Sequence, residues 1–447
     1  MPEPVTISPA RRAEVVDALR RGTVPSAGLD LFAVGMERFE RAVDEELDSA
    51  ASGRAVFKAV RGDYGAGKTF FARWLAERAK RRGMAAAEVQ VSETETPLHK
   101  LETVYRRLVE QLSTAAYPPS ALREIVDAWF YTLEEDILAE GMIEATAGTK
   151  LAEAVDELME RRLADVARTT PAFALAVRAY RKATLAGDQA TAQSLIAWIG
   201  GQPNVAAAAR RAAGVKGDLD HFAALGFLQG LLTILRDSGH PGLLLVLDEI
   251  ETLQRVRSDV REKGLNALRQ LIDEIDSGRF PGLYLLITGT PAFYDGPQGV
   301  SRLTPLAQRL ATDFGTDARF DSPRAVQLRL TGFDLPKLAS LGSNIRNVYA
   351  SGLGDAAQAR IATKVDDAYL EVLARAIAGD LGGQVGVAPR IFLRKLVADV
   401  LDRVAEFHDF DPRQHYTLTL KADELTDTER NATLSPARTA DDVELDL

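Results

Sequence analysis

Residues 62–69 form the most restrictive pattern in this chain, because they match G-x-x-x-x-G-K-[ST] at every position. A short strand is predicted just before them, at 55–60, and a helix just after them, at 70–82. In that setting glycines let backbone amides turn inward around phosphate oxygens, and the helix adds the positive end of its dipole. A glycine-rich surface turn is the alternative interpretation. The predicted nucleotide-binding residues are Gly62, Asp63, Tyr64, Gly65, Ala66, Gly67, Lys68, Thr69 and Phe70.

A second candidate motif is the apolar run Leu243–Leu247, which is followed directly by Asp248 and Glu249. A buried strand that ends in two carboxylates brings charge to the sheet edge at which ligands bind in open α/β folds. Lys68 is then predicted to reach the β- and γ-phosphates, while Thr69 and Asp248 hold Mg²⁺. Glu249 would orient and activate the attacking water as a general base. The alternative is a strand that enters a solvated turn.

Two weaker signals lie farther along the chain. The predicted strand 283–287 ends near Thr288 and Thr290, where a polar side chain could lie beside the terminal phosphate or the attacking water. Pro389 and Arg390 open an amphipathic helix, and an arginine at that position could extend into a cleft and bind phosphate. A strand-end threonine and a surface arginine are the alternatives.

Strands and helices are predicted to alternate over both ends of the chain. The predicted strands are 55–60, 86–91, 243–247, 283–287 and 326–330, and the predicted helices are 9–21, 36–47, 70–82, 97–112 and 260–276. Since these strands are almost continuously apolar, they indicate a parallel α/β sheet that is covered on both faces. Residues 335–407 show helical periodicity only.

The stretch between Lys68 and Asp248 covers 180 positions. A strand, a crossover and a second strand need only about 30 residues or a little more. The surplus has helical spacing and no convincing strand, so we expect a helical module that serves a partner. The expected domains are 1–112 and 240–334 as two parts of one core, 113–239 as a helical insertion, 335–415 as a helical lid, and 416–447 as an acidic, disordered tail.

The chain has 447 residues, a formal net charge of −10 and no cysteine. The absence of cysteine excludes disulfides and thiolate metal sites, and the acidic balance limits nucleic-acid contact to local patches. Two basic clusters are candidates for DNA contact, although charged helix ends are usually just solvated: Arg73, Arg78, Lys80, Arg81 and Arg82, and Arg11, Arg12, Arg20 and Arg21. No signal peptide or membrane span is expected, so we predict a cytoplasmic protein.

With these parts in this order, the chain resembles the AAA+ family of P-loop ATPases, close to its Orc/Cdc6-like and STAND branches. Gly62–Thr69 resembles the Walker A motif and Leu243–Glu249 resembles Walker B. By the same resemblance, Thr290 or Thr288 is sensor 1 and Arg390 is sensor 2 in a helical lid. Phe32–Arg38 resembles the segment that packs on adenine, with Met36 where that segment commonly has an arginine.

A closer resemblance is to the ATP-binding proteins of bacterial BREX (bacteriophage exclusion) systems, and size and motif order favour the shorter BrxD type over the larger BrxC type. The strings that carry it are 22–35, 60–70, 197–201 and 239–251. This resemblance implies an ATP- and Mg²⁺-dependent protein of phage defence that works beside a helicase and other system proteins.

Two functions remain open at this point. The first is an ATP-hydrolysing motor or loader that forms a homo-oligomer, in which a neighbouring subunit supplies an arginine to the site. Arg309 is the preferred candidate for that arginine among Arg302, Arg309, Arg319 and Arg324. The second is a slow nucleotide-gated switch or scaffold that assembles other defence proteins.

Overall fold

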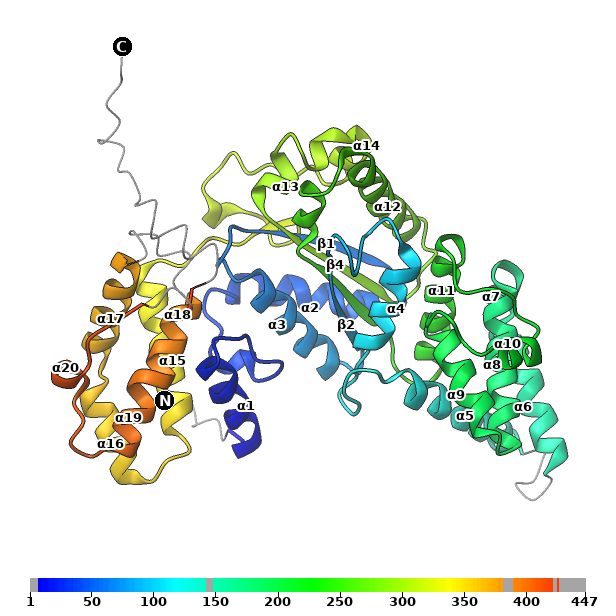
Figure 1. Ribbon diagram of the computed structural model, residues 1–447, viewed down its shortest axis with the longest axis horizontal. Coiled ribbons are helices and arrows are strands. Elements are labelled where there is room, and N and C mark those ends of the chain that lie inside the picture. Colours follow the sequence, from blue (N-terminus) through cyan, green and yellow to red (C-terminus); the bar gives the residue numbers. More distant parts are fainter. Residues whose placement is uncertain (1–6, 142–147, 381–388, 421–423, 426–447) are drawn as a thin grey trace, which may run out of the picture.

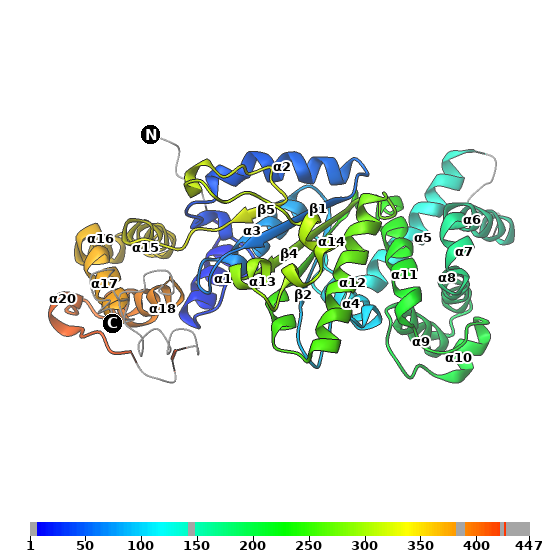
Figure 2. The same cartoon turned by 90° about the horizontal axis from the view of Figure 1, so that it is seen from above.

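The protein was analysed as a computed structural model that describes residues 7–141, 148–380, 389–420 and 424–425 (Figure 1). An α/β core lies in the middle of the molecule. One bundle of helices from the middle of the sequence lies at one end, and the C-terminal helices lie at the other end. Figure 2 shows the same order from above.

The core is built on one five-stranded parallel sheet with strand order β2-β3-β4-β1-β5. The strands are β1 (Val56–Arg61), β2 (Ala85–Gln90), β3 (Leu243–Asp248), β4 (Leu283–Gly289) and β5 (Gln327–Arg329). This confirms the predicted parallel sheet, with strand boundaries that differ from the expected ones by at most two residues. Because all strands run in the same direction, the carboxyl ends of β1, β3 and β4 meet at one edge.

Alternate residues of each strand enter two separate apolar cores, as the pleat of a strand requires. Leu243, Leu245 and Leu247 belong to one core, whereas Leu244 and Val246 belong to the other. On the first face lie α4 (Leu101–Gln111), α11 (His221–Asp237) and α12 (Ser258–Asp276), and on the second lie α2 (Glu37–Ala51) and α3 (Lys68–Arg81). Helix α1 (Pro9–Arg20) contributes to the second core. The sheet is therefore buried on both sides.

The regular elements in the described residues between β2 and β3 are all helices. The described residues of this segment contain no strand, apart from a single antiparallel bridge between Ala86 and Ser113. After α4 come α5 (Leu122–Ala139), α6 (Thr149–Arg162), α7 (Ala164–Thr169), α8 (Pro171–Leu185), α9 (Gln189–Ile199) and α10 (Ala207–Ala212). Their apolar side chains, such as Trp129 and Phe173, continue the first core outward, so this insertion is packed onto the sheet through α4 and α11.

The C-terminal helices form the other end of the molecule. They are α15 (Leu335–Ala350), α16 (Asp355–Lys364), α17 (Asp367–Asp380), α18 (Pro389–Arg394), the π-helical turn η6 (Lys395–Leu401), α19 (Asp402–Glu406) and α20 (Pro412–His415). Helix α1 packs against α18 and η6, and Arg20 of α1 pairs with Asp402 at 2.7 Å. The amino-terminal segment thus joins the C-terminal helices to the core.

Several residues of the expected acidic tail pack against the C-terminal helices. Every second residue from Tyr416 to Leu420, namely Tyr416, Leu418 and Leu420, contacts the second apolar core. Leu425 is buried in that core, and Glu424 pairs with Lys395 at 2.8 Å. The other residues of the tail, 421–423 and 426–447, lie outside the described residues. Sequence reasoning missed this period-two apolar pattern, because the charged composition of the segment is typical of disorder.

Within the described residues, no helix has both the length and the apolar character that crossing a membrane would require.

Between β4 and β5 lie the short helices α13 (Pro291–Asp295) and α14 (Thr304–Arg309).

Candidate nucleotide site

The loop between β1 and α3 has the geometry that its glycines predict. Gly65 and Gly67 have φ angles of 81° and 91°, in the left-handed region that favours glycine. A Cβ on Gly62 would lie 3.0 Å from the Ala66 side chain and 3.3 Å from Leu330, so the backbone there is closely packed. Gly67 caps α3 without any side-chain hydrogen bond to the first turn. The first amides of a 14-residue helix therefore remain available to an anion.

Lys68 lies in the first turn of α3 and is almost fully buried. Its ammonium donates to the Gly62 carbonyl at 2.9 Å and more weakly to the Asp63 carbonyl at 3.4 Å. The ring of Tyr64 lies 5.0 Å from the same nitrogen, within the range of a cation–π contact. The Lys68 ammonium is therefore held at the loop of residues 62–69, where it is predicted to bind phosphate.

Thr69, Asp248 and Thr288 form a chain of hydrogen bonds across three segments. The Thr69 hydroxyl donates to the Asp248 carboxylate at 3.1 Å, and the Thr288 hydroxyl donates to the other oxygen of that carboxylate. Thr288 is completely buried in β4, next to β3. Neither candidate threonine lines the cavity. Thr288 contacts Asp248, whereas Thr290 is the buried residue before α13.

Glu249 follows Asp248 in a left-handed conformation, with φ of 59°. This is an uncommon backbone for a glutamate, and it turns the chain sharply at the end of β3. Its amide donates to Thr288 Oγ1 at 3.3 Å, and its carboxylate accepts a hydrogen bond of 2.8 Å from the side chain of Gln90, at the end of β2. Sequence reasoning missed Gln90, because a polar residue at a strand end is too common to mark a site.

Glu251 is a second residue that sequence reasoning left without a role. It lies in the 3-10 turn η2 (Ile250–Gln254), lines the cavity and is only 4% exposed. Its carboxylate is 3.8 Å from Lys68 Nζ. Burial raises the pKa of Glu251, and the nearby Lys68 opposes that rise. Three carboxylates, from Asp248, Glu249 and Glu251, therefore line the same cavity as Lys68.

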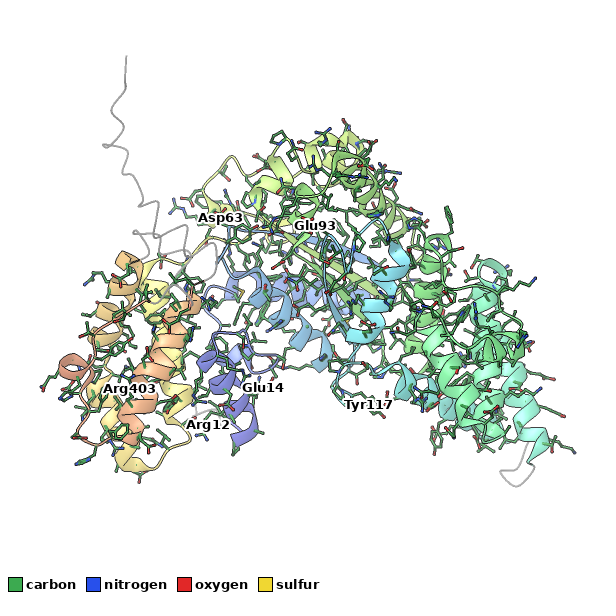
Figure 3. The ribbon with its side chains drawn as sticks, viewed as in Figure 1. Arg12, Glu14, Asp63, Glu93, Tyr117 and Arg403 are labelled. Carbon is green, nitrogen blue, oxygen red and sulfur yellow. The ribbon has the colours of Figure 1, made fainter. Side chains whose placement is uncertain are left out.

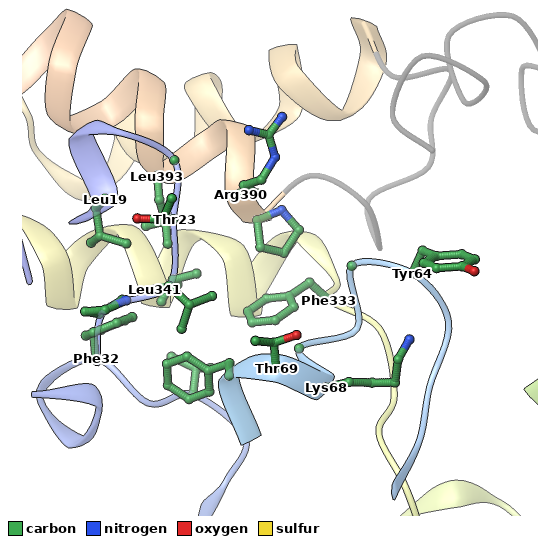
Figure 4. A pocket seen from close by; sticks show the side chains of 18 of the residues that line it. Leu19, Thr23, Phe32, Tyr64, Lys68, Thr69, Phe333, Leu341, Arg390 and Leu393 are labelled. Atoms are coloured by element: carbon green, nitrogen blue, oxygen red, sulfur yellow. The ribbon is translucent and has the colours of Figure 1, made fainter. Parts of the chain in front are cut away.

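The cavity has a volume of about 290 Å³ and two chemically distinct ends (Figure 4). Lys68, Thr69 and the three carboxylates lie at the polar end. The other end is formed mainly by apolar side chains of the amino-terminal segment, of α3 and of the C-terminal region: Leu19, Val24, Pro25, Phe32, Val34, Met36, Phe70, Phe333, Leu341 and Leu393. Such a wall suits a flat aromatic base, and Phe32 and Phe70 meet edge to face at 5.3 Å.

Arg390 lines this cavity from the start of α18, and in Figure 4 its guanidinium is directed away from Lys68 and Thr69. Its guanidinium donates to the Glu424 carbonyl at 2.6 Å, and one of its nitrogens would be 3.2 Å from a Cβ on Gly22. Apart from Thr288, Thr290 and Arg309, which do not line the cavity, the predicted site residues separate into two groups. Those that line the cavity are Tyr64, Gly65, Gly67, Lys68, Thr69, Phe70, Asp248, Glu249 and Arg390, whereas Gly62, Asp63 and Ala66 shape the loop from behind.

The residues present fit a magnesium–nucleotide complex. Magnesium prefers hard oxygen ligands and is usually held by one or two protein oxygens together with phosphates, and Thr69 and Asp248 supply such oxygens. The open amides of the loop and the ammonium of Lys68 suit a polyphosphate. The apolar end lies in the same cavity as the loop, so a base joined to that polyphosphate can occupy it.

Arg309 lies outside this cavity, at the end of α14. Its guanidinium forms an ion pair with Asp273 of α12 and donates to the Pro305 carbonyl at 2.8 Å. Arg324 pairs with Glu45 and Arg319 with Asp317, so these two candidates also have carboxylate partners within the chain. None of these contacts brings an arginine of this chain to its own phosphate loop.

Most residues of the two basic clusters form ion pairs with carboxylates of the same chain. Arg73 pairs with Glu88 at 3.0 Å, and Arg78 pairs with Asp44 at 2.6 Å. Further pairs join Arg81 and Arg11 to Glu77, Arg82 to Asp48, and Arg20 to Asp402. The guanidinium of Arg12 packs on Gly352, and Figure 3 shows Arg12 on α1 beside the C-terminal helices that carry Arg403. The clusters therefore act mainly as links between elements.

Comparison with known proteins agrees with the cavity. The family model described as BREX system ATP-binding protein BrxC/D matches residues 7–420, which is most of the chain. No curated protein is similar enough to count as a match. The family match confirms the resemblance predicted from the sequence motifs. The chain belongs to the BREX system ATP-binding protein BrxC/D family, and it is an ATP-binding protein of a BREX defence system.

Proposed function

We propose that this chain is a magnesium-dependent ATPase of the AAA+ type, of the BrxD kind, that acts in the cytoplasm. The observation that carries the proposal is the meeting of Thr69, Asp248 and Glu249 beside Lys68 at the carboxyl edge of the sheet. The sheet order, with β1 between β4 and β5, supports the same assignment.

The chain's own residues have distinct roles in this proposal. The loop amides and Lys68 bind the β- and γ-phosphates, and Thr69 and Asp248 hold Mg²⁺. The metal, when bound, stabilises negative charge that develops on the phosphate oxygens. Thr288 fixes the Asp248 carboxylate through its hydroxyl. Glu249 orients the attacking water and accepts its proton, and Arg390 contacts the terminal phosphate from the C-terminal helices.

The site needs one more cation if it follows the usual pattern of oligomeric P-loop ATPases. We propose that a homo-oligomer supplies it, with Arg309 of a neighbouring subunit as the first candidate. In this proposal Arg309 exchanges Asp273 for the phosphate of the adjacent site. Thr290 is proposed only as a structural residue before α13, since it is the hydroxyl of Thr288 that contacts Asp248.

Hydrolysis would then drive a motor or loader that acts with a helicase or on DNA. The insertion, residues 113–239, is the proposed partner-binding module, because it projects from the core at the end opposite the C-terminal helices (Figure 1). DNA contact through the basic clusters is the least supported part of this proposal, because their arginines form ion pairs within the chain.

A second candidate function is a slow nucleotide-gated switch that assembles other defence proteins. The hydrogen bond between Gln90 and Glu249 favours it, because a carboxylate tied to an amide is less free to accept a proton from water. In that case Glu249 is released only when a partner binds.

Measured turnover with and without DNA separates these functions. Phosphate release from ATP is compared for the wild type and for Glu249→Gln, with ATP affinity measured in parallel. A general base contributes about 10²- to 10⁴-fold, so a loss of that size with affinity retained is expected. Turnover that survives the substitution would remove Glu249 as the base, and no turnover in the wild type under any condition would favour the switch.

A further inference from the structure

Glu251 occupies an unusual position in the nucleotide cavity. It is the third residue after Asp248, in the 3-10 turn η2 that follows the left-handed residue Glu249. The side chain is 4% exposed, and neither carboxylate oxygen has a hydrogen-bond partner in another described residue. A buried carboxylate without such partners is costly, so its nearest cation decides how well it is tolerated.

That cation is Lys68, whose Nζ lies 3.8 Å from Glu251 Oε1. At this distance the two groups attract each other but form no hydrogen bond. The ammonium donates instead to the loop, to the Gly62 carbonyl at 2.9 Å and to the Asp63 carbonyl at 3.4 Å. The buried charge of Glu251 is therefore compensated mainly by Lys68, whereas the charge of Lys68 is compensated mainly by the loop carbonyls.

A bound polyphosphate would need the same cation. The cavity contains the carboxylates of Asp248, Glu249 and Glu251, against the cations of Lys68 and Arg390. Magnesium at Asp248 would compensate one carboxylate, and Glu249 has Gln90 and is partly exposed. Glu251 has neither kind of compensation in the described residues, so phosphate and Glu251 compete for one ammonium.

We propose that Glu251 is the counter-ion that Lys68 exchanges for phosphate when a nucleotide binds, and that this exchange sets the affinity of the site for nucleotides. The inference rests on the proposed function, because it requires the nucleotide to lie in this cavity. Glu251 acts through Lys68 and touches no reacting atom, so it is a positioning residue. Its carboxylate attracts the Lys68 ammonium in the absence of nucleotide and so weakens nucleotide binding.

Glu251→Gln tests the exchange, since it removes the charge and keeps the shape. Calorimetric titration with ADP, and separately with a slowly hydrolysed ATP analogue, should show binding at least about fivefold tighter than in the wild type, because one repulsive charge and one competitor are gone. Unchanged or weaker binding would overturn the proposal. In a Lys68→Ala background the same substitution should bring a clearly smaller gain, because only the repulsion between Glu251 and phosphate is then removed and no lysine remains to be released. A gain of equal size there would also overturn it.

Glu102→Gln is the matched control. Glu102 in α4 also has a buried carboxylate oxygen without a partner, but it does not line the cavity. Its substitution should leave nucleotide affinity unchanged. Circular dichroism checks the fold of each variant, and Glu251→Ala, which also removes the charge, replaces Glu251→Gln if the latter does not fold.

The outcomes distinguish this proposal from the proposed function. If the wild type binds no nucleotide, or if Lys68→Ala binds as well as the wild type, the nucleotide does not lie in this cavity and both proposals fail. If Lys68→Ala weakens binding but Glu251→Gln does not tighten it, only the role of Glu251 is refuted.

Discussion

The Thr69 hydroxyl donates a hydrogen bond of 3.1 Å to the Asp248 carboxylate, across 179 positions of the sequence. Thr69 is the second residue of α3 and Asp248 is the last residue of β3, and the whole helical insertion lies between them in the chain. Their oxygens meet because β3 and β1 end at the same edge of a parallel sheet, with β4 between them. This contact defines the polar end of the nucleotide cavity.

Thr69→Ala is expected to raise the magnesium concentration needed for nucleotide binding by about 10- to 100-fold, because it removes one of two protein oxygens from the proposed metal site. Titration of magnesium at fixed ADP measures this effect. Thr69→Ser keeps the hydroxyl and is the control, with a magnesium requirement close to that of the wild type. Equal requirements in all three proteins would contradict the assignment of Thr69.

Gln90→Leu is expected to lower ATP turnover by about tenfold, since a hydrogen bond to a charged group contributes ~1.5 kcal/mol to the orientation of Glu249. Nucleotide affinity should change little, because Gln90 does not line the cavity. Gln111→Leu, at the exposed end of α4, is the control. A rise in turnover would instead support the switch, with Gln90 restraining Glu249.

A mixing experiment tests whether Arg309 acts on a neighbouring subunit. Arg309→Ala and Lys68→Ala should each be inactive alone, for different reasons. When they are mixed, some interfaces combine an intact loop from one subunit with an intact arginine from the other, so phosphate release should reappear. If the mixture stays as inactive as its components while light scattering shows mixed oligomers, Arg309 serves only its ion pair with Asp273.

Glu251 also makes a prediction about pH. Burial raises its pKa above the ordinary value of 4.5 in the folded protein, so the folded state keeps a proton that the unfolded chain has lost. The stability of the nucleotide-free protein due to this group therefore falls as pH rises from about 4.5 through the higher folded pKa. The groups that face it are Lys68, Asp248, Glu249 and the Tyr294 hydroxyl.

Thermal unfolding at a series of pH values measures this effect. The melting temperature of Glu251→Gln minus that of the wild type should increase over that pH range, since all other carboxylates are common to both proteins. A difference that stays constant with pH would show that Glu251 keeps an ordinary pKa in the folded state.

Much of the core could be predicted because its signals are local. The loop at 62–69 has a fixed spacing, and the apolar runs of β3 and β4 are long enough to identify buried strands. From a parallel sheet it follows that Lys68, Thr69 and Asp248 meet at one edge. Thr288 could be chosen over Thr290 only with the strand register in hand, because Thr288 is the residue that reaches Asp248 from β4.

The remaining features depend on long-range packing that leaves no periodic signal. Gln90 and Glu251 are single polar residues whose role comes from the turn at Glu249 and from the neighbours of β2. The apolar end of the cavity brings Leu19 together with Leu393, and no local pattern links segments so far apart. Ion pairs such as Arg78 with Asp44 likewise turn an apparent basic patch into an internal contact.

The most direct test of this account is an experimental structure of the Glu249→Gln variant with ATP and Mg²⁺. We predict density for a triphosphate along residues 62–69, a metal bound by Thr69 beside Asp248, and the base between Phe32 and Leu393. A nucleotide bound elsewhere, or a phosphate loop that stays empty at saturating ATP, would contradict it.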